Sequence, residues 1–376
     1  MTSPLELAQA LIRCPSVTPE DAGVLDVLQE ALEGVGFACR RLKFEDVDNL
    51  YARFGSSAPN FCFAGHADVV PAGGAAQWTH PPFAAEVSGG RLYGRGVADM
   101  KGAVACFAAA ASSFVASSDA DFGGSISLLI TGDEEGPAVN GTVKVLEWMK
   151  ENGEAMDVCL VGEPSNPKQL GDMIKIGRRG SLNGKICVYG KQGHTAYPEL
   201  ADNPIPSLMR MMTVLNFADL DKKTKYFEAS KVEITSFDVG NRATNVIPSK
   251  ACAAFNVRFN DRRTGESLTE LLKKRFDKEG AVYDLEVDVT AEPFLTSPGP
   301  LSELISAAVE QVTGRRPDYG TTGGTSDARF IKDHCPVVEF GLISETAHGT
   351  DEHVNVADLE TLSEIYLAAL NGYFKV

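Results

Sequence analysis

Histidine and acidic side chains recur in this sequence at points where apolar, strand-like segments end. The segment 60–64 is followed by His66 and Asp68, and the segment 125–131 is followed by an acidic run that includes Glu134. Ligands of open α/β sheets gather beyond the carboxyl ends of the strands, so side chains with this placement can meet in one site. The residues that share it are His66, Asp68, Asp99, Glu134, Glu135 and Glu163.

These side-chain types indicate a metal site. Imidazole nitrogen combined with carboxylate oxygen suits Zn²⁺ or a similar first-row ion, because the set is too rich in nitrogen for Ca²⁺ and lacks the thiolates of a structural zinc site. A carboxylate can bridge two ions, and two ions ~3.5–4 Å apart can share a hydroxide and polarise a carbonyl group. The sequence therefore predicts a metal centre that can hold a pair of ions.

Two further roles follow from the neighbours of these ligands. Of the adjacent residues Glu134 and Glu135, one can bind metal while the other takes a proton from water as general base, and the residue types do not say which does which. Asp68 lies on the same side of an extended backbone as His66. It could therefore accept a hydrogen bond from the imidazole nitrogen that does not bind metal.

Other catalytic devices are absent from the sequence. There is no GxSxG, HExxH or GxxxxGK[ST] pattern, and the run 94–99 lacks the last glycine of a dinucleotide-binding GxGxxG. The eight cysteines are scattered without a CxxC pair, so we expect reduced thiols rather than disulfides or zinc ligands.

Composition limits the partners. The chain has 376 residues, of which 44% are hydrophobic and 23% charged, and its net charge of −16 disfavours nucleic acid and anionic membranes. The longest unbroken apolar stretch, residues 103–111, is far shorter than the ~20 residues of a membrane-spanning helix, and no secretory signal pattern is present at the N-terminus. We expect a cytoplasmic protein that binds neither nucleic acid nor membrane, and that captures an anionic small molecule through local arginines.

The order of apolar patterns predicts two domains. Up to about residue 180, helical and strand-like segments alternate, which is typical of an α/β fold with a mostly parallel sheet. The segments between residues 185 and 290 follow the order β-α-β-β-α-β of a ferredoxin-like α+β domain, after which helices and an apolar strand at 336–342 return. We therefore expect a catalytic domain of residues 1–179 and 293–376, interrupted by an inserted domain of residues 180–292.

Four ordered motifs resemble the M20 family of dinuclear zinc aminoacylases and carboxypeptidases. They are HADVVP at 66–71, GRGVADMKG at 94–102, GDEEG at 132–136 and VGEP at 161–164. The segments 174–182, 190–198, 245–248 and 322–330 further resemble one amidohydrolase branch of that family. The resemblance spans nearly the whole chain and implies a zinc-exopeptidase-like catalytic domain with an inserted ferredoxin-like dimerisation (lid) domain.

The resemblance also implies two Zn²⁺ per subunit, with Co²⁺ able to substitute. His66 and Glu163 would hold one ion, Glu135 and His348 the other, and Asp99 would bridge them. The C-terminal segment 346–354 offers a second histidine, His353, and reads Gly-Thr-Asp where relatives usually carry Lys, a β-branched residue and Asn; His348 is the preferred ligand.

Catalytic and substrate roles follow from the same resemblance. Glu134 would be the general base and Asp68 the partner of His66, while His194 would reach into the active site of a second subunit and stabilise the oxyanion, so that the enzyme is a homodimer built through the inserted domain. The residues implied to line the pocket of a multiply anionic substrate are Arg178, Tyr197, Asn245, Arg258, Gly324 and Thr325.

Two other functions stay open. Another amidohydrolase of the family, such as an acetylornithine deacetylase or an aminoacylase, would have the same metal ligands and would differ only around Arg178 and Thr325. A catalytically silent dimerisation or peptide-binding module built on this fold is expected to lose the general base or the bridging ligand. The presence of Glu134, Asp99 and His194 argues against it.

Overall fold

The structure is a computed structural model that describes residues 3–117, 122–217 and 219–376. The described chain divides into two compact units. Unit 1 comprises Met1–Ile176, Thr296–Gly320 and Ser326–Val376, and unit 2 comprises Gly177–Leu295 and Thr321–Thr325. The division falls at residues 176/177 and 295/296, against the expected 179/180 and 292/293, and the segment Thr321–Thr325 groups with unit 2 rather than with the catalytic domain.

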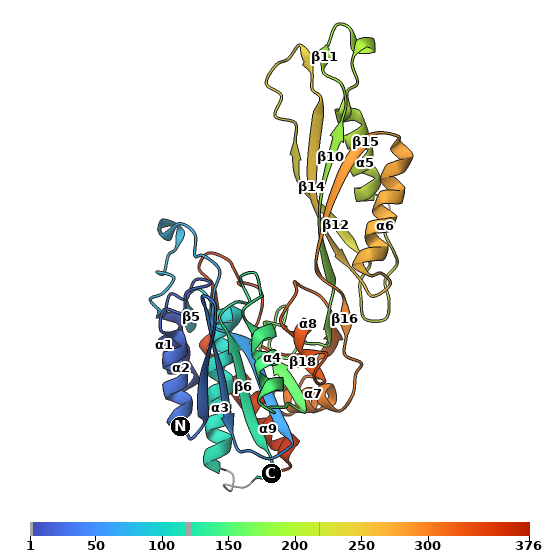
Figure 1. Cartoon of the computed structure of the whole chain (residues 1–376). Coiled ribbons are helices and arrows are strands. Elements are labelled where there is room, and N and C mark those ends of the chain that lie inside the picture. Colours follow the sequence, from blue (N-terminus) through green and yellow to red (C-terminus); the bar gives the residue numbers. More distant parts are fainter. Residues whose placement is uncertain (1–2, 118–121, 218) are drawn as a thin grey trace. The chain divides into compact units, whose positions relative to one another are not determined.

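Unit 1 is built on a mixed sheet with a parallel centre (Figure 1). The strand β3 runs parallel to both of its neighbours, β6 and β7, and β18 is parallel to β7, whereas β1 and β2 are antiparallel additions at one edge. In sheet order the strands are β1 (Ala38–Phe44), β2 (Val47–Phe54), β6 (Ser125–Thr131), β3 (Asn60–His66), β7 (Val158–Val161), β18 (Val337–Glu339), β8 (Met173–Lys175) and β17 (Asp318–Gly320).

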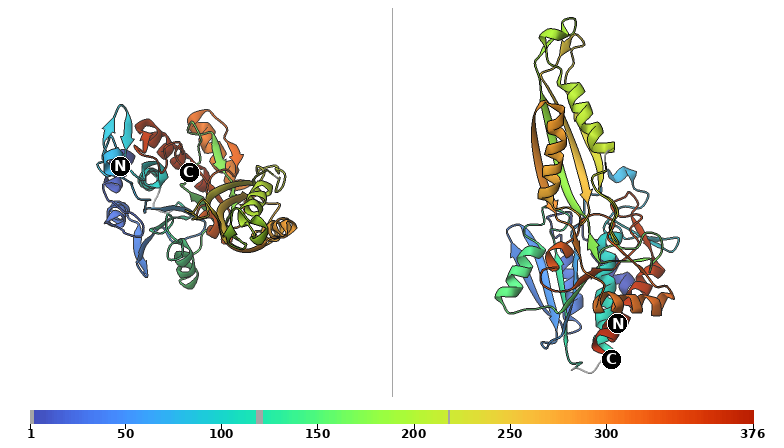
Figure 2. Two further views of the ribbon diagram at one scale, coloured as in Figure 1. Left: turned by 90° about the horizontal axis from the view of Figure 1, so that it is seen from above. Right: turned by 90° about the vertical axis from the view of Figure 1, so that its right-hand side faces the viewer.

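Helices cover both faces of this sheet. Helices α1, α3 and α9 pack together on one face of the sheet. Helices α4 and α8 contact each other on the opposite face, where α4 packs on β6 and α8 packs on β18 (Figure 2). Strands β3 and β6 are buried along almost their whole length, as expected where helices cover both faces of parallel strands. The helices are α1 (Pro4–Ile12), α2 (Val24–Glu33), α3 (Gly102–Ser117), α4 (Thr142–Glu151), α7 (Pro300–Thr313), α8 (Ala328–Ile331) and α9 (Val356–Phe374).

Helix α3 is the central helix of unit 1. Within the described residues, the segment Val97–Ser117 is long and apolar enough to cross a membrane, but 78% of its most apolar window is buried inside the protein. The rings of Phe63 on β3 and Phe107 on α3 stack with centroids 4.3 Å apart. The segment is therefore a core helix that fixes the chain directly after Asp99 against the sheet.

Unit 2 has the order β-α-β-β-α-β that the sequence predicts, which confirms the ferredoxin-like fold. Its antiparallel sheet has the strand order β12-β14-β10-β15, and α5 and α6 pack on one face (Figure 1). Burial alternates along β14, as expected of a sheet with one covered face. The elements are β10 (Gly180–Tyr189), α5 (Pro204–Phe217), β12 (Lys231–Asp238), β14 (Lys250–Phe259), α6 (Gly265–Phe276) and β15 (Val282–Ala291), with the short strands β9 (Gly177–Arg178), β11 (Gly193–His194), β13 (Val246–Ile247) and β16 (Phe294–Leu295).

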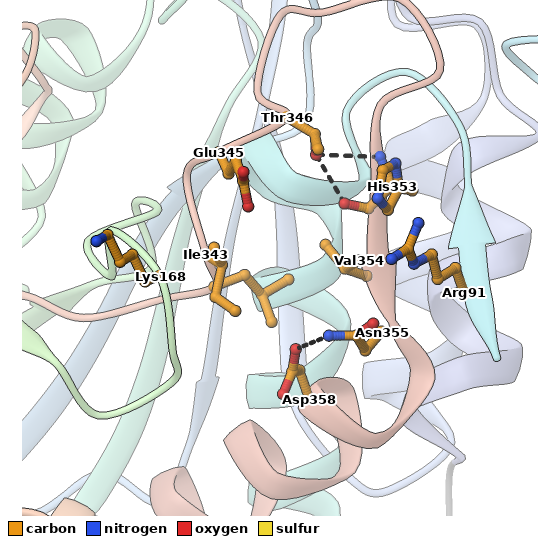
Figure 3. Close-up of a pocket in the computed structure, with 10 residues that line it drawn as sticks. Arg91, Lys168, Ile343, Glu345, Thr346, His353, Val354, Asn355 and Asp358 are labelled. Carbon is orange, nitrogen blue, oxygen red and sulfur yellow. Dashed lines mark hydrogen bonds between the residues drawn. The ribbon is translucent and has the colours of Figure 1, made fainter.

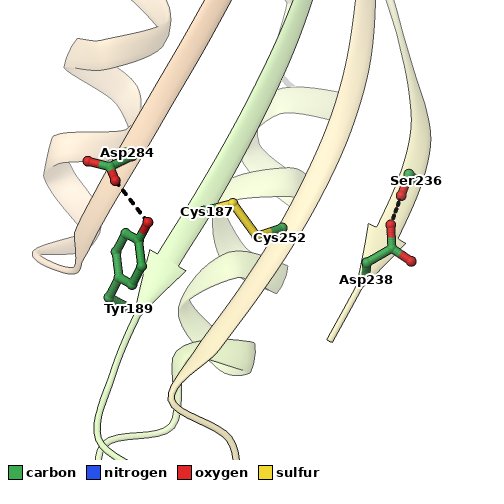
Figure 4. Close-up of a disulfide and its surroundings, with 6 residues drawn as sticks. All are labelled: Cys187, Tyr189, Ser236, Asp238, Cys252 and Asp284. Carbon is green, nitrogen blue, oxygen red and sulfur yellow. Dashed lines mark hydrogen bonds between the residues drawn. A yellow bond between two sulfur atoms is a disulfide. The ribbon is translucent and has the colours of Figure 1, made fainter. Parts of the chain in front are cut away.

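The expectation that all cysteines are reduced is wrong for one pair. Cys187 on β10 and Cys252 on β14 lie directly opposite each other in the ladder and form a disulfide, with a Cα–Cα distance of 4.1 Å (Figure 4). The two residues are 65 positions apart in the sequence, so only the register of two adjacent strands brings them together. The other six cysteines are free thiols, four of them buried.

Candidate metal centre

The sheet of unit 1 brings three of the candidate segments to one edge. His66 is the last residue of β3, Glu134 and Glu135 follow β6, and Glu163 follows β7. Because these three strands are adjacent and parallel, their carboxyl ends coincide. Asp99 enters this edge from the turn Val97–Lys101 that precedes α3.

The side chains of five residues converge there. Nε2 of His66 lies 3.2 Å from Oδ1 of Asp99 and 3.8 Å from Oε1 of Glu163. Nε2 of His348 lies 2.8 Å from Oε1 of Glu135 and 3.3 Å from Oδ2 of Asp99. The two oxygens of Asp99 thus face two different histidines, which is the geometry of a carboxylate that bridges two ions.

The donor set fits a pair of divalent metals. Ligand atoms within 4.8 Å of one another form overlapping groups, one of His66, Asp99 and Glu163 and another of Asp99, Glu135 and His348. Each group offers one imidazole nitrogen and two carboxylates without a thiolate, as suits a first-row divalent ion that performs hydrolysis. The site is therefore a divalent-metal site.

The electrostatics of this cluster favour a cation. Hydrogen bonding to Asp99, and then to Glu135, raises the pKa of His348 to about 10. Burial lowers the pKa of His66, but the hydrogen bond to Asp99 and nearby carboxylates outweigh it and raise that pKa well above the usual value. Burial raises the pKa of Asp99, yet the two histidines hold it far below its ordinary range. The carboxylates around the two imidazoles thus favour positive charge at this place.

The alternative histidine lies elsewhere. His353 on β19 (His353–Asn355) faces the ring of Tyr93 on β5 (Arg91–Tyr93) at 5.0 Å, and its backbone N–H donates to Oγ1 of Thr346. Figure 3 shows it among the residues that line a separate cavity, with Arg91, Lys168 and Asp358. This cavity has a volume of about 110 Å³. The structure thus brings His348, and not His353, to Asp99.

Glu134 stands beside these residues in a half-buried position. It forms a third close group with His66 and Glu135. Burial, and then the charge of Glu163, raises the pKa of Glu134 well above that of an exposed glutamate. A carboxylate whose proton affinity is raised in this way suits the acceptance of a proton from water and its later release.

The expected bond between the carboxylate of Asp68 and His66 is not what the structure contains. Nδ1 of His66 is 2.9 Å from the backbone carbonyl oxygen of Asp68, whereas the carboxylate is 3.7 Å away. The carboxylate instead accepts hydrogen bonds from the backbone N–H groups of Glu134, at 3.3 Å, and Glu135, at 3.0 Å. The two backbone N–H groups attract the charge of the carboxylate more strongly than Nδ1 of His66 does, because Nδ1 already has the carbonyl oxygen as its partner. Asp68 therefore positions the loop of the two glutamates.

All the candidate substrate residues lie in unit 2, in two groups. Arg178, Arg258, Gly324 and Thr325 lie near the start of β10: Nη1 of Arg178 donates to the carbonyl oxygen of Gly324 at 3.0 Å, and Arg258 pairs with a residue at the start of that strand. His194, Tyr197 and Asn245 lie beyond its other end, where His194 pairs with Val246 of β13.

These two groups are far apart within one chain. Strand β10 spans Gly180–Tyr189, which at ~3.3 Å per residue separates its ends by roughly 30 Å. The expected single pocket is therefore not formed by these six residues of one chain, and His194 lies in the same distant group as Tyr197 and Asn245.

Sequence reasoning missed two charged residues next to the ligands. Arg95 and Glu352 form a buried ion pair, with Nη1 of Arg95 2.6 Å from Oε2 of Glu352. Both residues lie inside motifs already recognised as chemical, 94–102 and 346–354. A glutamate in a polar loop is expected to be exposed to solvent, so the burial of Glu352 could not be predicted from the sequence.

With this fold and site described, the class of the protein follows. The chain belongs to peptidase family M20/M25/M40, whose model matches residues 62–372, and it is a metal-dependent hydrolase. It is 57% identical over 99% of its length to a succinyl-diaminopimelate desuccinylase of Rhodospirillum centenum, of which 97% is covered. It is also 56% identical over its whole length to the desuccinylase of that name from Rhodospirillum rubrum, of which 99% is covered.

Solved structures share the fold at low identity. An M20 family metallo-carboxypeptidase from Sulfolobus solfataricus matches with a TM-score of 0.79 at 19% identity, each chain being covered completely. A Bacillus subtilis protein described as a dinuclear metal-binding peptidase of the M20 family matches with a TM-score of 0.72 at 17% identity, over 98% of this chain and 97% of that one. These neighbours confirm the predicted zinc-exopeptidase-like fold.

Proposed function

We propose that this enzyme hydrolyses N-succinyl-LL-2,6-diaminopimelate to succinate and LL-2,6-diaminopimelate, in the cytoplasmic synthesis of diaminopimelate and lysine. The observation that carries the proposal is the full-length identity of 56–57% to relatives named for this reaction, combined with the complete ligand cluster around Asp99. We further propose two Zn²⁺ per subunit, one held by His66 and Glu163, the other by Glu135 and His348, with Asp99 between them.

Bound ions would supply a water of lowered pKa and an electrophile for the amide carbonyl. Glu134 takes a proton at its carboxylate and delivers it to the amine that leaves. Asp68 holds the backbone of Glu134 and Glu135 through its two oxygens, so the base and its neighbouring ligand keep a fixed spacing. Charge that develops on the carbonyl oxygen requires a further donor, which we assign to His194.

The substrate is an anion, and unit 2 holds local positive charge to meet it. Burial, and then the neighbouring Arg258, lowers the pKa of Arg179, and burial lowers that of Arg258. Such shifts mean that the two guanidinium groups gain from a nearby negative charge. Arg178, which is 3% exposed, adds a third guanidinium group. Guanidinium groups bind carboxylates in bidentate fashion, and the succinyl substrate carries three carboxylates.

The separation of the two groups in unit 2 supports a homodimer. A pocket that contains both Arg178 and His194 requires residues from opposite ends of β10, roughly 30 Å apart in one chain. Two copies related by a two-fold axis satisfy this requirement, because each can lend its His194 end to the other. We therefore propose a homodimer through unit 2 in which His194, Tyr197 and Asn245 serve the partner's site.

Mixing two inactive variants tests the dimer. The variant His194→Ala keeps its own base, and Glu134→Gln keeps its own His194. In a mixed dimer with exchange between subunits, one site regains both groups, so a random mixture recovers about a quarter of wild-type activity. A His194 that acted within its own chain would give no recovery at all.

The choice of acyl substrate is tested by comparing N-succinyl-LL-diaminopimelate with N-acetylornithine on the zinc-loaded enzyme. Cleavage of the succinyl substrate by a large margin supports the proposal. Preferential cleavage of acetylornithine would retain the metal chemistry but overturn the assignment of the substrate.

A further inference from the structure

The buried ion pair of Arg95 and Glu352 contacts the backbone of two proposed metal ligands, His348 and Asp99. Arg95 is 3% exposed and Glu352 is fully buried. Withdrawing two charges from water costs several kcal/mol per ion, so such a pair is weak evidence of a stabilising role. Its other hydrogen bonds indicate what it does instead.

Glu352 holds the turn from which Asp99 projects. Besides Arg95, its Oε2 accepts from the backbone N–H of Gly96 at 3.1 Å, and its Oε1 accepts from those of Ala98, at 2.9 Å, and Asp99, at 3.3 Å. The backbone of Asp99 is not helical, with φ −130° and ψ 93°. The carboxylate of Glu352 is thus the partner that fixes this peptide.

The turn has little freedom to accommodate another arrangement. Gly96 has a φ of +86°, and a Cβ there would lie 2.4 Å from Cγ1 of Val69. Lys101, fully buried at the end of the turn, donates to the carbonyl oxygens of Leu11 and Cys14. Glu352 therefore acts on a turn that is anchored at both ends, where a small rotation of one peptide would move the Asp99 carboxylate.

Arg95 also contacts the backbone of a second proposed ligand, His348. Its Nη2 donates to the backbone carbonyl oxygen of His348 at 3.2 Å. His348 has a φ of +62°, in the left-handed region that residues other than glycine rarely occupy. Such a backbone persists where surrounding contacts hold it. One guanidinium group therefore connects the support of Asp99 to the backbone of His348.

We propose that Arg95 and Glu352 are positioning residues for the second metal ion, the one between Asp99, Glu135 and His348. They hold a bridging ligand and a terminal ligand, which come from distant parts of the chain, at a fixed separation. The inference rests on the proposed function, because it assumes a pair of ions. Supporting partners of this kind typically change metal affinity or activity 10- to 100-fold when they are altered.

The primary test is Glu352→Gln, which keeps the size of the side chain but removes its charge and one acceptor oxygen. Metal-free protein is titrated with Co²⁺ and with Zn²⁺ by calorimetry, and the visible absorption of the Co²⁺-loaded protein is recorded. We expect one of the two binding steps to lose ~10- to 100-fold in affinity, the Co²⁺ bands to shift, and kcat to fall while KM stays nearly constant.

A matched control separates positioning from general damage. Arg53 and Glu154 form a second ion pair of unit 1, which is partly buried and lies between β2 and the segment after α4. Glu154→Gln also removes the charge of one partner of an ion pair, but it should leave both metal affinities and the Co²⁺ spectrum unchanged. If Glu352→Gln fails to fold, Arg95→Lys replaces it, because one ammonium group cannot reproduce the planar fork that binds Glu352 and the His348 carbonyl together.

The outcomes are distinguishable. A folded Glu352→Gln or Arg95→Lys protein with wild-type affinities and a wild-type Co²⁺ spectrum overturns the inference alone. A wild-type protein that binds fewer than two ions overturns the proposed metal pair itself, and the inference with it.

Discussion

The role of Asp68 gives a sharp prediction, because the structure and the sequence assign it different partners. Each of its oxygens accepts one backbone N–H, from Glu134 and from Glu135, and the side chain is 1% exposed. The substitution Asp68→Asn turns one of these oxygens into an NH₂ group. That group faces an N–H donor that then has no partner.

The expected cost follows from these contacts. A hydrogen bond to a charged group contributes ~1.5–3 kcal/mol, and a buried donor left without a partner costs ~1–3 kcal/mol. We therefore expect a loss of about 2–4 kcal/mol in the positioning of the Glu134 and Glu135 loop. If this free energy is lost mainly from the stabilisation of the transition state, kcat/KM falls ~30- to 1000-fold. The ion between His66 and Glu163 should remain bound, because the carbonyl oxygen that supports His66 is unchanged.

Steady-state kinetics and zinc titration of the same preparation measure the two effects. Asp133 supplies a matched control in the same loop: its Oδ2 alone accepts from the N–H groups of Val139 and Asn140, so Asp133→Asn can keep both bonds through its amide oxygen. We expect it to lose less than ~10-fold in activity. A normal turnover of the loaded Asp68→Asn enzyme, with zinc affinity lost at the ion that His66 holds, would refute this reasoning and restore the carboxylate as the partner of His66.

Three further predictions concern the centre and its substrate. Glu134→Gln should retain both ions in a metal assay but lose ~10²–10⁴-fold in kcat, the usual contribution of a general base; near-normal turnover would exclude Glu134 from that role. The pKa of His348 is raised to about 10 in the metal-free protein, so at pH 7 its imidazole is protonated and zinc must displace that proton; calorimetry in buffers of different ionisation enthalpy should show proton release and an affinity that rises from pH 7 towards pH 10, and a pH-independent affinity would contradict this. Arg178→Lys should raise KM for the succinyl substrate by ~10-fold or more, since a bidentate fork becomes a point charge, whereas the exposed Arg262→Lys should not; equal KM values in the two variants would remove Arg178 from recognition.

The convergence of the ligands could be predicted from the sequence for a physical reason. His66, Glu134 and Glu163 each follow an apolar strand, and parallel neighbouring strands end at one edge of a sheet. Periodicity likewise predicted the β-α-β-β-α-β order of unit 2, because one covered face imposes alternation on its strands.

Other features depend on three-dimensional register or on competition between partners. Cys187 and Cys252 meet only because β10 and β14 pair in one register. Asp68 was predicted to contact His66 from its spacing alone, but two free N–H groups of a loop 66 residues later compete for the same carboxylate. The burial of Glu352 is equally non-local, since its donors lie more than 250 residues earlier.

The central claim, a hydrolase that needs two ions around Asp99, is tested most directly by metal add-back. Metal-stripped protein is supplied with increasing amounts of Zn²⁺, and hydrolysis of N-succinyl-LL-diaminopimelate is measured at each ratio of zinc to chain. We predict no hydrolysis without metal and full activity only after the second equivalent, with Asp99→Ala inactive throughout. Hydrolysis by the stripped protein, or undiminished activity of Asp99→Ala, would contradict the account.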